Sequence, residues 1–455
     1  MLRSFTLTEV AEALTGNLLG ADALFDGVGT DSRKAVAGQL FVALTGPRFD
    51  GHAYLADVAA QGAAAALVER AMPEVQLPQL VVADTRLALG RLGAFNRDLF
   101  QGRLAAVTGS SGKTTVKELL ATILRQQGAT LATQGNLNNE LGAPLTLLQL
   151  AAEHAFGVIE LGASHVGDIA YTVSLTRPDV VIITNAGQAH VGEFGGVDRI
   201  IEAKGEIIEG VGEAGTVVLN RDDAAFATWQ RRAAGRKVVA FGLDARADIR
   251  ASAVTLDAQG RPSFLLHTAQ GEAPVTLQLL GAHNVGNALA AAAAALSLGL
   301  ELATVVRGLT AAAPVQGRTL TRTSQRGAQV IDDSYNANPA SVKAGIDLLA
   351  ALPGRRVVVL GDIAELGEWT EQGHRDVGEH ARGKVDAFYS VGSSMAHAAH
   401  AYGSEARHFA DREQLIEALA DEDRAGTTLL IKGSRSAAMD KVVAALCALN
   451  TEEKH

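Results

Sequence analysis

The chain has 455 residues, 47% of them hydrophobic and 20% charged, so at about 100 to 200 residues per domain it can form roughly two to four domains and is not mainly disordered. Fifty acidic and 40 basic residues give a formal net charge of −10, which excludes non-specific attraction to nucleic acid or to an anionic membrane surface. A single cysteine, Cys447, excludes intramolecular disulfides and cysteine-based zinc sites.

The first residues do not resemble a signal peptide or a membrane anchor. Glu9 and Glu12 interrupt what would have to be an apolar signal core, and no segment approaches the roughly 18 uninterrupted apolar residues of a spanning helix. We therefore expect a cytoplasmic protein that neither inserts into a membrane nor binds nucleic acid and that acts as a monomer.

Residues 1–100 are expected to form a small α/β unit. Apolar runs alternate there with turn-rich stretches such as TGPRFDGH at 45–52, a pattern typical of short strands joined by loops. The apolar runs lie at 40–44, 65–69 and 80–84.

A different pattern begins at Arg103. The apolar run LAAV leads into a glycine- and serine-rich loop, and a helical stretch follows from Lys113 to about residue 127. The same order of strand, loop and helix recurs, with further apolar runs at 156–161, 179–184, 216–220 and 237–241. This repetition predicts a parallel sheet flanked by helices.

The segment between residues 247 and 280 breaks that pattern. Its short extended runs, RASAVTL, SFLLHT and VTLQLL, predict an antiparallel patch. An alanine-rich helix is expected from about residue 284 to residue 298, because alanine has the highest helix propensity.

A third α/β unit is expected after a proline and a glycine interrupt the chain in AAAPVQGR, residues 311–318. Its apolar runs lie at 329–333, 356–362, 387–392 and 428–434. The fold class is therefore α/β with three domains: residues 1–100, residues 101–313 with the parallel sheet and its antiparallel patch, and residues 314–455.

The segment TGSSGKTT, from Thr108 to Thr115, follows a predicted strand and opens a predicted helix, which is the setting of a phosphate-binding loop. Glycines let backbone N–H groups approach phosphate oxygens, the helix N-terminus adds positive potential, Lys113 neutralises charge and a threonine hydroxyl can bind Mg²⁺. Val107 stands where the usual pattern has its first glycine, so the P-loop is shortened. A plain glycine turn is the alternative, and Lys113 with Thr114 argues against it.

Two candidate metal ligands follow buried strands, where open α/β sheets gather their sites. Glu160 ends the run FGVIE, and His190 follows the next strand in TNAGQAHVGEFG. The alternative role for Glu160 is to cap the turn in LGAS. For His190, position alone favours a structural role and a role as metal ligand equally.

Lys204 lies on the apolar stripe of a predicted helix, a position that forces a lysine to find a carboxylate, to shift its pKa or to be modified. The stripe consists of Val197, Ile200, Ile201, Ile207 and Ile208. An ion pair with Glu202 or Glu206 is a poor alternative because residues two apart on a helix do not face each other. The main alternative is that the Lys204 side chain extends its ammonium group to solvent.

Further polar side chains occur in constrained loops or at strand ends. Asn138 and Asn139 precede a glycine and a proline in NLNNELGAPLT, and Asn284 is either the N-cap of the alanine-rich helix or a nucleotide contact. The segments DDSYNANPAS (332–341) and LIKGSRS (430–436) suit recognition of charged small molecules.

At these residues the sequence resembles the Mur ligase family, the ATP-dependent amide-bond ligases of peptidoglycan precursor synthesis. The resemblance extends from TDSRK at 30–34 to KGSRSAAM at 432–439. Its motifs are TGSSGKTT, NLNNELGAPLT, VIELGAS, AHVGEFG, AKGEI, GAHNVGNALAAAA, DDSYNANPAS, GDIAELG and KGSRSAAM.

The resemblance implies a different role for each of three domains. An N-terminal domain would hold the UDP part of a precursor, a central domain would be the ATPase, and a C-terminal Rossmann-like domain would close the site. It also implies roles for the matching residues. ATP would be bound by Gly109, Ser110, Ser111, Gly112, Lys113, Thr114, Thr115, Asn284, Arg318 and Asp333. Mg²⁺ would be bound by Thr114 or Thr115, Glu160, His190 and a Lys204 that is carbamylated by CO₂. The substrates would be bound by Asp31, Ser32, Arg33, Asp50, Gly51, His52, Asn138, Asn139, Tyr335, Asn336, Asn338, Lys432 and Arg435.

The reaction implied by the resemblance joins D-alanyl-D-alanine to UDP-N-acetylmuramoyl-tripeptide through an acyl phosphate, with ATP and two Mg²⁺ ions as cofactors. Lys113, Glu160, His190 and Lys204 would be the catalytic residues. Two alternatives differ from this reading: a folylpolyglutamate-synthase-like ligase would lack DDSYNANP and the precursor-binding domain, and a P-loop switch or motor would not need an inward-facing Lys204.

Overall fold

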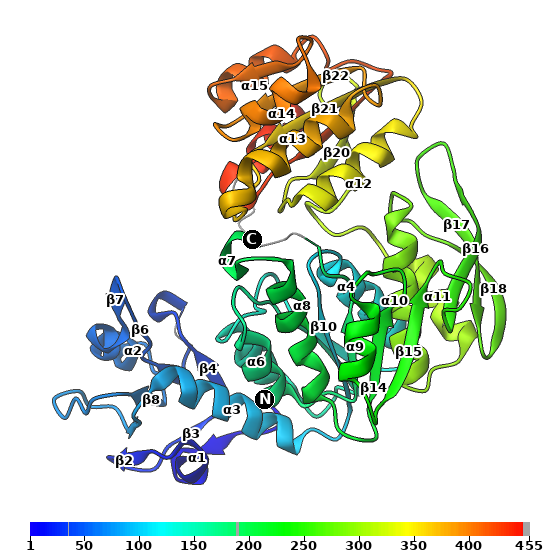
Figure 1. The fold of residues 1–455 in the computed structure, drawn as a ribbon. Helices are drawn as coiled ribbons and strands as arrows, with labels where there is room; N and C mark the ends of the chain where they lie inside the picture. Colours follow the sequence, from blue (N-terminus) through cyan, green and yellow to red (C-terminus); the bar gives the residue numbers. More distant parts are fainter. Residues whose placement is uncertain (35, 188–190, 449–455) are drawn as a thin grey trace.

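The computed structural model describes residues 1–34, 36–187 and 191–448, and it contains three main sheets that follow one another along the chain (Figure 1). The N-terminal unit lies beside the central unit, and the C-terminal unit lies across the central unit from above in the view of Figure 1. The expected α/β class is confirmed. Within the described residues, no helix is long and apolar enough to cross a membrane.

The N-terminal unit is built on a five-stranded sheet with the order β2 (Asn17–Leu19), β9 (Gln79–Val81), β8 (Ala65–Val68), β5 (Gln39–Val42) and β4 (Gly27–Gly29). The runs predicted at 40–44, 65–69 and 80–84 correspond to three of these strands. Two small antiparallel pairs accompany the sheet: β1 (Phe5–Thr6) with β3 (Leu24–Phe25), and β6 (Thr45–Gly46) with β7 (Phe49–Asp50). Its helices are α1 (Leu7–Leu14), α2 (Leu55–Ala60) and α3 (Thr85–Leu99).

The central unit contains a nine-stranded sheet in which only the last two strand pairings, β16 with β17 and β17 with β18, are antiparallel. The order is β11 (Thr130–Ala132), β12 (Phe156–Glu160), β10 (Arg103–Thr108), β13 (Val180–Ile183), β14 (Thr216–Asn220), β15 (Lys237–Gly242), β16 (Ile249–Leu256), β17 (Pro262–Thr268) and β18 (Gly271–Thr276). Both the parallel sheet and the antiparallel patch are therefore confirmed. The extended run predicted at 275–280 is mostly wrong, because β18 ends at Thr276.

Helices cover both faces of the central sheet, because the alternate side chains of a strand point to opposite faces. Ala105 and Val107 of β10 pack in the core that contains α4 (Lys113–Arg125), α10 (His283–Ser297) and α11 (Leu302–Ala311). Leu104 and Ala106 pack in the opposite core, with α5 (Gly142–Leu147), α6 (Asp168–Thr176) and α9 (Phe226–Arg232). In α10, residues 288–295 are all fully buried, and all but Leu289 are alanines, whose small side chains let the helix pack closely in this core.

The C-terminal unit has a six-stranded sheet that is parallel except for its edge strand β19 (Leu320–Thr323). The order continues with β20 (Gln329–Asp333), β24 (Thr427–Lys432), β21 (Arg355–Gly361), β22 (Ala387–Val391) and β23 (Arg407–Phe409). Its helices are α12 (Pro339–Ala350), α13 (Thr370–Ala381), α14 (Met395–Tyr402), α15 (Arg412–Leu419) and α16 (Asp440–Cys447). Separate cores on the two faces of this sheet give the expected Rossmann-like layering.

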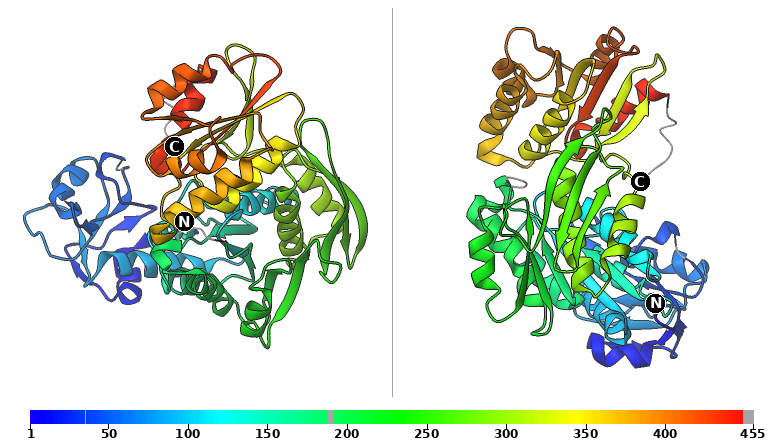
Figure 2. Two further views of the ribbon diagram at one scale, coloured as in Figure 1. Left: turned by 45° about the horizontal axis from the view of Figure 1, so that its top comes forward. Right: turned by 90° about the vertical axis from the view of Figure 1, so that its right-hand side faces the viewer.

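A short helix of the central unit, α7 (Val191–Phe194), touches the C-terminal unit beside the 3₁₀ turn Gly367–Trp369 (Figures 1 and 2). The Gly192 N–H donates a hydrogen bond of 3.1 Å to the Glu365 carbonyl. A Cβ at Gly192 would lie 2.4 Å from the Gly367 nitrogen, so the two backbones meet where only glycine fits. This contact keeps the two units together on one side of the cleft between them.

Gly192→Ala is expected to open the molecule, because the added methyl group meets backbone atoms that no side-chain rotation can move. We expect a larger radius of gyration by small-angle X-ray scattering. Gly212→Ala is the control, since a Cβ at Gly212 meets nothing within 4 Å. An identical radius of gyration for wild type and both variants would contradict this role of the contact.

Candidate active site

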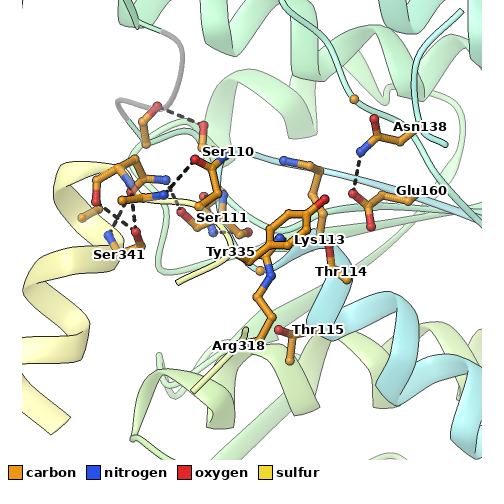
Figure 3. A pocket seen from close by; sticks show the side chains of 18 of the residues that line it. Ser110, Ser111, Lys113, Thr114, Thr115, Asn138, Glu160, Arg318, Tyr335 and Ser341 are labelled. Carbon is orange, nitrogen blue, oxygen red and sulfur yellow. Dashed lines mark hydrogen bonds between the residues drawn. The ribbon is translucent and has the colours of Figure 1, made fainter. Parts of the chain in front are cut away.

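A cavity of about 950 Å³ lies between the central and C-terminal units, where the carboxyl ends of strands from both sheets meet (Figure 3). It brings together most of the residues that the sequence singled out. Those residues are Ser110, Ser111, Gly112, Lys113, Thr114, Thr115, Asn138, Asn139, Glu160, Asn284, Arg318, Asp333, Tyr335, Asn336, Asn338, Lys432 and Arg435.

The phosphate loop connects β10 to α4 in the predicted order of strand, loop and helix. Gly109 and Gly112 have φ values of +148° and +81°, a region that favours glycine. Space is restricted as well, because a Cβ at Gly109 would lie 1.9 Å from the Thr184 hydroxyl. The alternative of a plain glycine turn does not explain the cation at the helix start.

Asn185, at the end of the neighbouring β13, holds the phosphate loop in place. Its backbone carbonyl accepts a hydrogen bond from the Ser110 N–H, and its side-chain oxygen accepts one from the Ser111 N–H, both at 3.0 Å. Its amide nitrogen donates to the Ser111 carbonyl at 3.0 Å. Sequence reasoning missed this residue, although its position directly after the run 179–184 is the signal that identified Glu160.

Lys113 lies in the cavity with a charge that no carboxylate among the described residues pairs with directly. Its ammonium donates to the Gly109 carbonyl at 2.7 Å. Burial lowers the pKa of Lys113, an effect that the nearby Glu160 opposes and Arg318 reinforces. A cation held by a neutral acceptor beside glycine N–H groups is well suited to bind phosphate oxygens.

Glu160 is 2% exposed and has one oxygen without a hydrogen-bond partner among the described residues. Its Oε1 accepts a hydrogen bond of 2.8 Å from the Asn138 amide, while Oε2 is the unpartnered atom (Figure 3). The carboxylate therefore does not cap the following turn. Leaving a buried carboxylate oxygen unsatisfied is costly, and a cation is the partner that would satisfy it.

The oxygen atoms around Glu160 are suitable ligands for Mg²⁺. This ion prefers oxygen ligands and is often bound by one or two carboxylates together with phosphates and water. The hydroxyls of Thr114 and Thr115 line the same cavity. The part of the chain that the structure describes contains no group of three or more histidine, cysteine, aspartate or glutamate residues placed to hold a metal. His190 lies outside the described residues.

Lys204 is 1% exposed in α8 (Val197–Gly205), so it does not extend to solvent. Its ammonium lies 5.3 Å from the centre of the Phe194 ring. Glu206 does not pair with it but accepts hydrogen bonds from the Gly167 and Ala170 N–H groups. Burial, and secondarily the charge of Lys113, lower the pKa of Lys204 to about 7. Inclusion of Val197 in the buried stripe is wrong, because it is 40% exposed at the helix start.

Asn284 is buried inside α10 and is not its N-cap, which is Ala282. Its amide donates to the Leu280 carbonyl at 2.7 Å and its oxygen accepts from Asn287 at 2.8 Å. The capping alternative is therefore wrong. Asn287, which also lines the cavity, was missed by sequence reasoning although it lies one helical turn further along.

Arg318 reaches the cavity from the segment that leads into the C-terminal unit. Its guanidinium stacks on the Tyr335 ring at 4.4 Å, and its NH₂ group lies 3.5 Å from the Thr114 hydroxyl (Figure 3). Asn338 caps α12 and donates to the Ser111 hydroxyl at 2.9 Å. Residues of the C-terminal unit thus contact the phosphate loop directly.

Lys432 and Asp333 form a buried ion pair of 2.6 Å at the ends of adjacent strands. The same ammonium donates to the Asn336 carbonyl at 2.9 Å, and the second oxygen of Asp333 accepts from the Thr319 N–H at 3.2 Å. Both charges therefore support the loops at the cavity wall.

The N-terminal residues singled out by the sequence do not line this cavity. Asp31 forms an exposed ion pair with Arg33, and Ser32 lies between them in a 3₁₀ turn. His52 is 1% exposed, and both of its ring nitrogens are engaged, Nδ1 with Asp50 at 2.7 Å and Nε2 with the Glu69 N–H at 2.9 Å.

Several polar residues of the cavity wall were not assigned individually from the sequence, although Asn136, Ser164, His283 and Ser341 lie within motifs that it singled out. They are Asn136, Ser164, His165, Asp168, Asp223, His283 and Ser341. Most of them follow a strand at a distance of several residues, so only the folded loops bring them to the cavity.

Comparison with known proteins agrees with this geometry. The family model described as the Mur ligase middle domain matches residues 107–295, that of the Mur ligase glutamate ligase domain matches 317–435, and that of the Mur ligase family catalytic domain matches 24–97. A UDP-N-acetylmuramoyl-tripeptide–D-alanyl-D-alanine ligase of Escherichia coli K12 is 45% identical over 447 residues, which cover 97% of this chain and 98% of that protein.

The chain belongs to the Mur ligase family.

Solved structures of this family also match almost the whole chain. A crystal structure of MurF from Acinetobacter baumannii has a TM-score of 0.93 and 39% identity and covers 98% of this chain and 100% of that one. The MurF ligase of Thermotoga maritima in complex with ADP has a TM-score of 0.85 and 28% identity and covers 93% and 97%. The Mur ligase fold is therefore shared throughout the chain.

Asp333→Asn is expected to destabilise this Mur ligase by about 3–5 kcal/mol, because it leaves the buried Lys432 ammonium without its carboxylate. The measurement is the midpoint of urea unfolding. Asp386→Asn is the control: it removes an ion pair with Arg356 whose side chains are 34% and 30% exposed, and such pairs contribute about 0–1 kcal/mol. Equal midpoints for the two variants would show that the buried pair does not stabilise the fold.

Proposed function

We propose that this Mur ligase joins D-alanyl-D-alanine to UDP-N-acetylmuramoyl-tripeptide, with ATP converted to ADP and phosphate. The full-length similarity to the E. coli ligase of that name carries the proposal. A cavity with a phosphate loop on one wall and polar strand ends of a second unit on the other supports it.

The reaction proceeds in two steps. A terminal carboxylate oxygen of the tripeptide attacks the γ-phosphorus of ATP, the bond to the β-phosphate oxygen breaks, and ADP leaves the resulting acyl phosphate. The amine of D-alanyl-D-alanine then attacks the acyl carbon, loses a proton and displaces phosphate. Both steps develop charge on oxygens, which fixed cations and N–H groups stabilise.

The residues of the phosphate loop bind the ATP phosphates. Gly109 to Thr115 supply N–H groups, hydroxyls and the Lys113 ammonium. Arg318, stacked on Tyr335, contributes a second cation from the opposite side. Asn284 and Asp333 complete the nucleotide site.

Two Mg²⁺ ions would neutralise phosphate charge in this site. Thr114 or Thr115, Glu160 and His190 would bind Mg²⁺, which fits the unpartnered Oε2 of Glu160. A carbamylated Lys204 would position a second ion. Carbamylation converts a buried cation into an anionic ligand, which fits a lysine that has no carboxylate partner among the described residues.

The remaining assignments follow the division into domains 1–100, 101–313 and 314–455. The UDP part is assigned to Asp31, Ser32, Arg33, Asp50, Gly51 and His52, although the engaged ring of His52 fits a supporting role better than a direct contact. The peptide substrates are assigned to Asn138, Asn139, Tyr335, Asn336, Asn338, Lys432 and Arg435. The C-terminal unit also shields the acyl phosphate from water. We further propose that the enzyme acts as a monomer in the cytoplasm.

The two alternatives are less consistent with the chain. A folylpolyglutamate-synthase-like ligase does not account for the N-terminal unit, and a P-loop switch does not account for the buried Lys204 or for a second unit that contacts the phosphate loop.

The function is tested by phosphate release. Release from ATP is expected only when both UDP-N-acetylmuramoyl-tripeptide and D-alanyl-D-alanine are present. Lys113→Ala is expected to abolish it while the UDP precursor still binds, because the phosphate loop and the precursor domain are separate. ATP hydrolysis at the same rate with and without the two substrates would overturn the proposed ligase activity.

Carbamylation of Lys204 is tested with ¹³C-labelled bicarbonate. Only the neutral amine reacts with CO₂, and with a pKa of about 7 roughly half of the Lys204 amine is neutral at pH 7. A ¹³C carbamate signal in the NMR spectrum is therefore expected to grow as the pH rises through 7 and to be absent in Lys204→Arg. A spectrum without a carbamate signal in the wild type would refute the modification.

A further inference from the structure

A buried lysine outside the cavity connects the phosphate-loop helix to the strand end beside Glu160. Lys117 is 2% exposed and lies one helical turn after Lys113 in α4. Its ammonium donates a hydrogen bond of 2.5 Å to the carbonyl of Thr133 and lies 2.9 Å from the carboxylate of Glu118. Neither Lys117 nor Thr133 lines the cavity, so neither touches the reacting groups.

Thr133 is 1% exposed and uses all three of its hydrogen-bonding groups on neighbouring elements. Its N–H donates to the Val158 carbonyl at 3.0 Å, its carbonyl accepts from Lys117, and its hydroxyl accepts a 2.9 Å bond from the Glu160 N–H. β11 ends one residue earlier, at Ala132, so the hydroxyl takes the place of a ladder carbonyl for Glu160.

The loop that begins after Thr133 also reaches the Glu160 side chain. Asn138, five residues further along, donates to Oε1 of Glu160 at 2.8 Å, and its own carbonyl accepts from the Gly162 N–H at 2.8 Å. The backbone and the carboxylate of Glu160 are thus both held by one segment, and Lys117 attaches that segment to the helix that begins with Lys113.

We propose that Lys117 and Thr133 are positioning residues that set Glu160 relative to the phosphate loop and thereby determine how tightly the metal–nucleotide complex binds. This inference rests on the proposed function, in which Glu160 is a ligand of Mg²⁺. Residues that orient a metal ligand typically change metal affinity about 10- to 100-fold when replaced.

Thr133→Val tests the proposal with little change in side-chain volume. The probe is Mn²⁺ in the presence of ADP and without peptide substrates, and its binding is measured by electron paramagnetic resonance. We expect Mn²⁺ to bind about 10- to 100-fold more weakly than in wild type. Thr133→Ser, which keeps the hydroxyl, is expected to bind Mn²⁺ with the wild-type affinity.

Thr176→Val is the matched control. Thr176 is a fully buried threonine in α6 whose hydroxyl donates to the Thr172 carbonyl at 2.8 Å, and it does not line the cavity. This variant is expected to keep wild-type Mn²⁺ affinity. Lys117→Met is expected to weaken Mn²⁺ binding as Thr133→Val does, and Lys117→Arg is expected to weaken it less.

The outcomes separate this inference from the proposed function. Equal Mn²⁺ affinity in wild type and Thr133→Val, in an enzyme that still releases phosphate with both substrates, overturns the positioning role alone. Equal weakening in Thr133→Val and Thr176→Val also overturns it, because the effect is then one of general stability. If the wild-type protein binds neither Mn²⁺ in the presence of ADP nor either of the two peptide substrates, the proposed function and this inference are both overturned.

Discussion

The site depends on buried charges that the chain does not fully neutralise by itself. The Lys113 ammonium contacts a neutral carbonyl, the Lys204 ammonium faces the ring of Phe194, and one oxygen of Glu160 has no partner among the described residues. Desolvating such groups costs free energy unless they gain partners of opposite charge. Phosphate groups would supply such a partner for Lys113 and a cation would supply one for Glu160, so an arrangement that is costly in the free protein favours binding of the nucleotide.

The order of strands in the central sheet places these charges. β10 lies between β12 and β13, so Glu160 and Thr184, each at the end of a flanking strand, come to the two sides of the phosphate loop. The loop is held from the β13 side, through Thr184 and Asn185. On the β12 side, Thr133 and Asn138 hold Glu160 itself.

The C-terminal unit supplies the other half of the site through a small number of specific contacts. Asn338 contacts Ser111, Arg318 approaches Thr114, and the Gly192 backbone meets Glu365 and Gly367 on the far side. The Lys432–Asp333 pair stabilises the strand ends that carry these contacts. The contacts between the two units therefore involve the phosphate loop itself.

The sequence by itself determined the α/β class, the phosphate loop, the place of Lys204 on an apolar helix stripe and the strand-end position of Glu160. These features follow from local signals, namely hydrophobic periodicity, glycine spacing and charge within a short window. Only the tertiary structure decided which strand ends are neighbours, that Glu206 caps α6 instead of pairing with Lys204, and that Lys117 and Thr133 support Glu160. Those contacts join residues that are far apart along the chain, and the lateral order of strands, which no local pattern encodes, brings them together.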